Sequence, residues 1–174
     1  MKDENRPEPG GSYHQLPAKL PFVFCYTIAI LASIWGTSMA FAIKAEIGDP
    51  RARTFAFTAQ KTMYGGRQIA EGDTMFVFAS ENEGGQGLIA RGIVTYVKAI
   101  AKKRGIARQT PRVSVTVKRS ALARRPLGRN ELKHLTDWKD GEPGTELNFK
   151  FYRQATNKIV GISDRAAAFL NEYF

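Results

Sequence analysis

The sequence predicts an α+β domain built on a curled, barrel-like mixed sheet of five to six short strands, with short helices at its periphery. Three observations lead to this prediction. Short apolar or alternating segments recur between residues 41 and 118, Gly-containing turns separate them, and helical spacing is confined to two short segments nearer the C-terminus. Hydrophobic residues make up 43% of the 174 residues, which is enough to form a core.

The first half of the domain contains four predicted strands. Residues 41–46 open it, and residues 53–58 alternate apolar and polar side chains, which predicts a short strand or an extended loop. Residues 74–80 follow a Glu-Gly-Asp turn and have the strongest strand pattern. Residues 88–100 are rich in β-branched side chains, so we expect them to form a hairpin with residues 74–80, closed by the Gly-rich loop 81–87.

The second half contains three more predicted strands and two helices. Residues 112–118 alternate strictly and should point Val113, Val115 and Val117 inward, while residues 148–153 alternate likewise and residues 158–162 should complete the sheet. Asn130 and Ser163 are good N-cap residues, which predicts helices over residues 130–138 and 164–173.

Residues 1–38 are expected to be an extension before a domain that spans residues 39–174. Residues 1–19 are polar and rich in Pro and Gly, which is typical of a disordered tail. Residues 20–43 carry no charge and are long enough to span a membrane, which takes about 20 apolar residues. Three interpretations stay open. We prefer a natural start at Met39 in a cytoplasmic protein, because a strand pattern follows at once. The alternatives are a membrane anchor through residues 20–43 and a cleaved signal peptide.

The positive charge is concentrated in one quarter of the chain. The net charge is +10, and residues 91–133 contain thirteen Lys and Arg residues against a single acid, Glu131. Such a concentration attracts polyanions, of which nucleic-acid backbones are the commonest, although a solvated surface or a membrane surface would have the same composition. The residues expected to contact phosphates are Lys102, Lys103, Arg104, Arg124, Arg125 and Arg129.

The composition argues against most kinds of catalytic or metal site. One cysteine and two histidines cannot form a disulfide framework or a Cys/His zinc site. The Gly-rich segment at residues 83–87 has neither Walker nor dinucleotide-binding spacing, and His134 falls on the polar side of its predicted helix. We therefore expect no catalysis, no cofactor and no metal. The remaining enzymatic alternative is a magnesium-dependent nuclease built on carboxylates such as Asp137 and Asp140.

Three segments resemble the EVE domain, a member of the PUA-like superfamily. Residues 41–46 (FAIKAE) are similar to its first strand, residues 72–82 (GDTMFVFASEN) to its Gly-Asp turn and following strand, and residues 87–94 (GLIARGIV) to the partner strand. The resemblance covers residues 39–174. The chain departs from the family pattern at Ile47, where a proline usually follows the glutamate, so the loop after the first strand is expected to differ.

The resemblance implies a PUA-like fold and a binding module that acts on nucleic acid. Relatives of the EVE domain are associated with modified bases held in an aromatic-walled pocket, and the flanking phosphates would lie on basic residues. The side chains expected to form the pocket are Lys44, Thr62, Tyr64, Phe78, Ser80, Asn82 and Trp138. The competing interpretations are core packing for Phe78, a surface pair with Glu46 for Lys44, and turn chemistry for Ser80 and Asn82.

Overall fold

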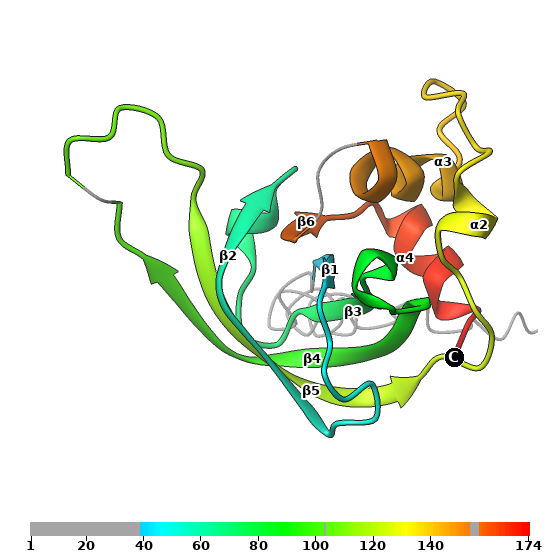
Figure 1. Ribbon diagram of the computed structural model, residues 1–174, viewed down its shortest axis with the longest axis horizontal. Helices are drawn as coiled ribbons and strands as arrows, with labels where there is room; N and C mark the ends of the chain where they lie inside the picture. The colour runs from blue at the N-terminus through cyan, green and yellow to red at the C-terminus, as the bar shows by residue number, and fades with distance from the viewer. Residues whose placement is uncertain (1–38, 103, 154–156) are drawn as a thin grey trace, which may run out of the picture. The chain divides into compact units, whose positions relative to one another are not determined.

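Six strands close into a mixed β-barrel in the computed structural model, which describes residues 39–102, 104–153 and 157–174 (Figure 1). The strands are β1 (Ala40–Ala45), β2 (Thr54–Met63), β3 (Thr74–Ala79), β4 (Gly87–Ile100), β5 (Arg112–Leu122) and β6 (Lys158–Gly161). Their order around the barrel is β1-β3-β4-β5-β2-β6. The pairs β1/β3 and β2/β6 are parallel and the other four are antiparallel, so the predicted fold class is confirmed.

Two hydrophobic clusters lie on the two sides of β1 and β3. Inside the barrel, Phe41 and Met75 pack with Val113, Val115 and Val117, which confirms the predicted direction of these valines. On the outer side, side chains of the same two strands pack against the helices. Because β1 and β3 are buried on both faces, their sequences are continuously apolar instead of alternating.

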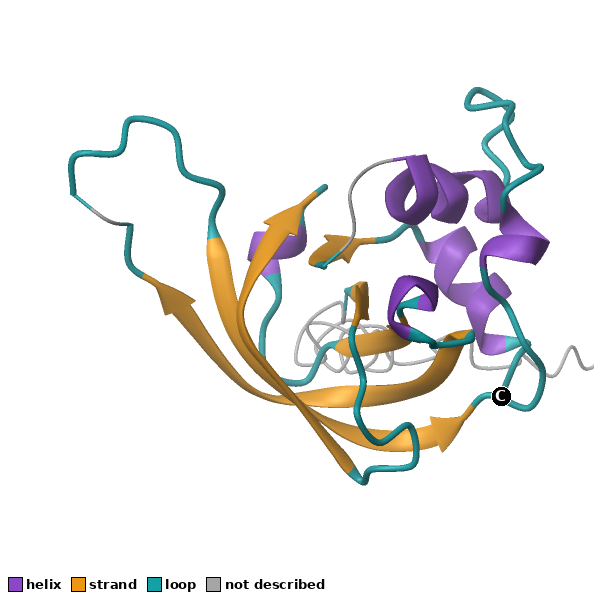
Figure 2. Ribbon diagram, in the orientation of Figure 1, coloured by secondary structure: helices purple, strands orange, loops and turns teal. Residues whose placement is uncertain are grey.

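Helices α2 (Arg129–Leu132), α3 (Pro143–Asn148) and α4 (Asp164–Asn171) gather with the π-helical turn η3 (Phe149–Arg153) on one side of the barrel (Figure 2). Two short 3-10 turns complete the helical elements: η1 (Gly66–Gln68), which lies beside β2, and η2 (Glu81–Glu83), which follows β3. The predicted cap of the last helix is confirmed, because the amide of Ala166 donates to the hydroxyl of Ser163 at 3.1 Å. Ala166 and Leu170 turn inward and dock α4 on the barrel.

One predicted strand is wrong: residues 148–153 are helical. Pro143 occupies the first turn of α3, where a proline is well tolerated, and the chain continues from α3 straight into η3. The Phe149 and Phe151 side chains, whose alternation suggested a strand, lie on different sides of this turn. Phe151 packs on Phe78 with ring centroids 4.9 Å apart, and Phe149 contacts the aromatic rings described below.

The helix predicted over residues 130–138 is much shorter. It begins after Gly128, whose amide donates to the Glu131 carboxylate at 2.7 Å, so Asn130 lies within the helix and does not cap it. It ends at Leu132, since the following residues form turns in which the Asp137 carboxylate accepts from the amide of Lys139.

Strand β2 extends beyond the predicted 53–58 to Met63. A bulge between Phe57 and Gln60 shifts its register, and the strand continues after it. Ala59 adopts a positive φ of 50° at the bulge, and its amide donates to the Ser114 hydroxyl at 2.9 Å. The bulge lets β2 pair with β5 along its first part and with β6 at its end. Strands β4 and β5 lead to a loop over residues 101–111, which Figure 1 shows on the opposite side from the helices; we call this loop with the adjoining strand ends the arm.

The interpretations of residues 1–38 concern residues outside the described part of the chain. Residues 40–43, the end of the uncharged run, form the beginning of β1. Among the helices of the described residues, none is long and apolar enough to cross a membrane.

Candidate functional site

Lys44 forms the centre of a buried polar cluster. Its ammonium has no solvent exposure and lies 2.6 Å from Oε2 of Glu81, which follows β3. The same carboxylate accepts from the Tyr152 hydroxyl and, at 2.9 Å, from the amide of Arg129. The Tyr152 ring covers Lys44, with the ammonium 4.0 Å from the ring centroid. The interpretation of Lys44 as a surface partner of Glu46 is therefore wrong.

The electrostatics of this cluster keep the Glu81 carboxylate charged. Burial lowers the pKa of Lys44, while the hydrogen bond and charge of Glu81 act in the opposite direction. Burial alone would raise the pKa of Glu81, but the hydrogen bonds from Lys44 and Tyr152 outweigh it and bring this pKa below its ordinary value. Burial and the hydrogen bond to Glu81 raise the pKa of the Tyr152 hydroxyl well above its usual range, so it stays protonated and donates.

Three other predicted pocket residues are buried near this cluster or in the barrel wall. Phe78 is completely buried in the core, and Ser80 is buried where its amide donates to the carbonyl of Ala45 at 2.8 Å. The Thr62 hydroxyl donates to the carbonyl of Pro111 at 3.1 Å. Asn82 is exposed in η2. Phe78, Ser80 and Asn82 lie at or just after the end of β3, whereas Thr62 belongs to β2, and the ring of Tyr152 covers the Lys44 ammonium.

Tyr64 and Trp138 meet in a second place, through Phe149. The ring of Phe149 is 5.9 Å from that of Tyr64 and 5.6 Å from that of Trp138, with edge-on geometry in both pairs. Tyr64 remains 37% exposed and Trp138 38% exposed. The guanidinium of Arg153 lies 5.1 Å from both the Trp138 and the Phe149 ring centroids. We call Tyr64, Trp138 and Phe149 the aromatic cluster.

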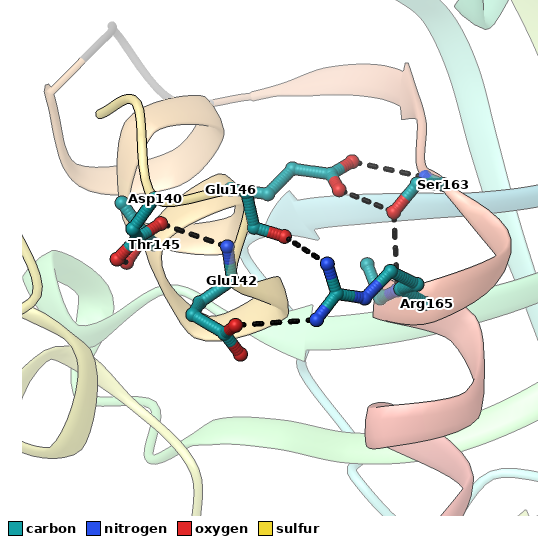
Figure 3. A network of polar contacts seen from close by, with 8 residues as sticks. Asp140, Glu142, Thr145, Glu146, Ser163 and Arg165 are labelled. Carbon is teal, nitrogen blue, oxygen red and sulfur yellow. Dashed lines mark hydrogen bonds and ion pairs between the residues drawn. The ribbon is translucent and has the colours of Figure 1, made fainter. Parts of the chain in front are cut away.

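A hollow of about 280 Å³ lies beside the aromatic cluster. It is lined by Trp138, Asp140, Gly141, Glu142, Thr145, Glu146 and Phe149. Its carboxylates are held in place by the network in Figure 3: Asp140 accepts from the Thr145 hydroxyl at 2.8 Å and from the amide of Glu142 at 2.7 Å, and Glu142 pairs with Arg165 at 3.2 Å. One wall of the hollow is therefore aromatic and the other carries hydrogen-bond acceptors.

The residues expected to contact phosphates fall into two groups. Lys102 and Arg104 are exposed in the arm, whereas Arg124, Arg125 and Arg129 follow the other end of β5. Arg125 stacks over Tyr173 at 4.1 Å and pairs with Glu172 at 3.8 Å. Lys103 lies outside the described residues.

Four residues of these sites were not found from the sequence: Glu81, Phe149, Tyr152 and Arg153. Three of them belong to residues 148–153, where the predicted strand would have pointed Phe149 and Tyr152 to opposite faces of a sheet. A helical interpretation of that segment, signalled by Pro143 at its start, would have brought them toward the predicted pocket residues.

The described residues contain no group of three or more His, Cys, Asp and Glu side chains that could hold a metal ion. Asp137 and Asp140, the carboxylates considered for a nuclease, both accept hydrogen bonds within the turn that follows α2. His134 is exposed.

The chain matches no protein-family model and no curated protein. Its structure is similar to the DUF55 domain of human thymocyte nuclear protein 1, with a TM-score of 0.53 and 14% identity over 76% of this chain and 96% of that one. A hypothetical protein from Leishmania major matches with a TM-score of 0.50 and 15% identity, over 77% and 92% of the two chains. Human THYN1 in complex with DNA containing 5-methylcytosine matches with a TM-score of 0.46 and 16% identity, over 78% and 96%.

The likeness to the first two structures is one of fold, since the identities are too low to show more. It covers about three quarters of this chain and nearly the whole of each matched domain. The closed barrel agrees with the fold that the resemblance of residues 41–46, 72–82 and 87–94 implies. The described domain therefore shares its fold with the DUF55 domain of thymocyte nuclear protein 1.

Proposed function

We propose that this domain binds nucleic acid without catalysing a reaction on it, and that it holds one unstacked base against the aromatic cluster. The observation that carries the proposal is the pair of partly exposed rings, Tyr64 and Trp138, placed on either side of Phe149 next to a hollow. Exposed aromatic rings near cations are the usual platform for a base, and each stacked base contributes about 1–3 kcal/mol.

The hollow suits the edge of a base better than a phosphate. Asp140 and Glu142 bring carboxylate oxygens to its lining, and a carboxylate repels phosphate but accepts hydrogen bonds from an exocyclic amino group such as that of cytosine. A methyl group on the base would lie against the aromatic wall formed by Trp138 and Phe149. We therefore propose that the site distinguishes a modified base that carries an amino group from its unmodified form.

The other predicted pocket residues receive a different role in this proposal. Lys44 contacts Tyr152 and Phe78 contacts Phe151, so these two residues position the turn η3, which presents Phe149 to the aromatic cluster. Ser80 and Thr62 are buried and hold the neighbouring strands through their hydrogen bonds to Ala45 and Pro111. Asn82 is exposed and free to contact the strand on either side of the base. Arg153, which is exposed and lies 5.1 Å from the Trp138 and Phe149 ring centroids, would contact the nearest phosphate of that strand.

A binding titration with short DNA and RNA strands, with and without base methylation, tests the proposal. The Trp138→Ala variant should lose about 5- to 150-fold in affinity for the preferred modified strand, which is what one stacked base contributes, and the preference for the modified over the unmodified strand should shrink. Tyr96→Ala removes a more exposed ring in β4 and should leave that preference unchanged.

Two results would contradict the proposal. If the parent domain bound none of the strands, nucleic-acid binding itself would be wrong. If Trp138→Ala weakened the modified and the unmodified strands equally, the aromatic cluster would not recognise the modification.

A further inference from the structure

Four cationic residues lie side by side across four strands. Arg112 of β5 is the direct partner of Lys61 of β2, Lys61 is the partner of Lys158 of β6, and Lys158 is the partner of Lys44 of β1. We call these four residues the cation row. Cross-strand partners have Cβ atoms only about 4.5–5.5 Å apart, and like charges at such positions destabilise a sheet.

Only one member of the cation row is balanced by an acid. Lys44 pairs with Glu81, but among the described residues no carboxylate lies within 4.0 Å of the charged nitrogens of Lys61, Arg112 or Lys158. Arg112 donates to the carbonyl of Ala59 at 2.7 Å, and the ammonium of Lys158 lies 3.0 Å from the sulfur of Met63. Burial, together with the nearby charge of Lys61, lowers the pKa of Lys158.

The exposed end of the cation row opens into a hollow of about 480 Å³ beneath the arm. Lys61 and Arg112 line it, and Lys102 of the arm adds a third cation from the other side. The apolar part of the lining comes from Ile100 and Ile106, which are 37% and 53% exposed. No acidic residue contributes to the lining. We call this space the arm hollow.

We propose that the arm hollow binds one phosphate of a nucleic-acid backbone, held between Lys61, Lys102 and Arg112. The bound anion would compensate the repulsion along the cation row, which nothing else in the described residues does. Ile100 and Ile106 offer apolar contact to the sugars beside the phosphate, so the site fits a phosphodiester within a strand better than a free phosphate ion.

This inference rests on the proposed function, because it assigns where the backbone lies. It also adds Lys61 and Arg112 to the residues expected to contact phosphates. Charge density alone does not point to Lys61, because this residue lies outside the basic quarter of the sequence, and only the pairing of β2 with β5 places it next to Arg112.

The salt dependence of binding to a DNA duplex tests the arm hollow. Replacing a residue that contacts one phosphate reduces the slope of log affinity against log salt by about one. Lys61→Gln and Lys102→Gln should each show this loss. In the double variant the slope should also fall by about one and not by two, because both side chains contact the same phosphate. Inorganic phosphate should not compete with the duplex beyond the effect of its ionic strength.

Lys118→Gln is the matched control. Lys118 is an exposed lysine of β5 whose cross-strand partners, Thr54 and Ile93, are uncharged, so its replacement should change neither the slope nor the melting temperature. Lys61→Gln should instead raise the melting temperature of the free protein by about 1–4 °C, because it relieves repulsion with both Arg112 and Lys158.

Several results would overturn the arm hollow while leaving the proposed function intact. A parent protein that binds the duplex, combined with unchanged slopes in Lys61→Gln and Lys102→Gln, would exclude a phosphate there. An equal reduction of the slope in Lys118→Gln would indicate that the positive charges act as a diffuse electrostatic field and not at one site. A slope reduced by two in the double variant would indicate two separate phosphates. A melting temperature that falls in Lys61→Gln would show that Lys61 stabilises the free protein and that the cation row is not strained.

Discussion

The buried pair of Lys44 and Glu81 is the clearest example of a single contact that organises the structure. A lysine with no solvent exposure is costly unless its charge is compensated. Glu81 compensates it and also accepts hydrogen bonds from Tyr152 and from the amide of Arg129. One carboxylate thus joins β1, η2, η3 and the start of α2, and these are the elements that surround the end of the barrel.

We expect Glu81→Gln to destabilise the protein by about 3–5 kcal/mol, because it leaves the Lys44 ammonium buried without a counter-charge. The double variant Lys44→Met with Glu81→Gln removes both charges and should recover most of that loss. Urea denaturation of the three proteins measures both values. The Arg125–Glu172 pair is exposed, so Glu172→Gln is a control that should change little. A double variant that is no more stable than Glu81→Gln would contradict the pair.

Residue types and spacing identified part of the candidate site. Lys44, Tyr64 and Trp138 were expected at a pocket because the family resemblance calls for aromatic and polar side chains around a base, and they lie at the two clusters described above. The partners that bring them together, Glu81, Tyr152 and Phe149, could not be predicted. Apart from the contact of Phe149 with Trp138, their contacts join segments about 37 to 108 positions apart in the chain, and no local pattern encodes such pairs.

Glu146 joins three consecutive helical elements, α3, η3 and α4, through its carboxylate. This carboxylate of α3 accepts from Lys150 of η3 at 2.6 Å. It also accepts from the amide of Ser163, the cap of α4, at 2.9 Å (Figure 3). Burial would raise the pKa of Glu146, but the hydrogen bonds of Lys150 and Ser163 outweigh burial and lower the pKa below its ordinary value. The charged form therefore stabilises the contact between the two helices.

Stability should consequently fall in acid. A carboxyl group whose pKa is lowered in the folded state contributes its stabilisation fully above its unfolded pKa of about 4.5, and loses it as the pH falls through the folded value. Melting temperatures measured from pH 7 to pH 3 should show this loss, and Glu146→Gln should be less stable at pH 7 but less sensitive to acid. Parallel curves for the parent and Glu146→Gln would contradict this role of Glu146.

The elements that the sequence predicted well are those with a local pattern and a matching environment. The strict alternation of residues 112–118 predicted β5 because one face meets the core and the other does not. Alternation was misleading at residues 148–153, where Phe149 and Phe151 are both partly or fully covered, but by different partners around a helical turn. Six residues are too short to distinguish a period of 2 from one close to 3.6 when every side of the segment is in contact.

At the scale of the whole domain, the basic residues form two separate groups. The arm lies before β5, whereas Arg124, Arg125 and Arg129 follow it, so the length of β5, at most about 35 Å, separates them. This distance exceeds the Debye length of about 8–10 Å at physiological salt, so the two groups act independently on a ligand. The sequence shows all these residues in one basic quarter, and only the strand between them reveals the separation.

This separation predicts how binding depends on the length of the ligand. A duplex rises about 3.4 Å per base pair, so about ten base pairs are needed to reach both groups. On a duplex of about sixteen pairs, the losses of affinity in Lys61→Gln/Lys102→Gln and in Arg124→Gln/Arg125→Gln should add when the variants are combined, because the groups share no contact. On a duplex of about six pairs, each molecule reaches one group at a time, so either double substitution alone should cost little affinity. The combined variant should then lose more than the sum of the two separate losses. Full additivity on the short duplex would mean that both groups contact the same few base pairs, and that the backbone does not run along β5.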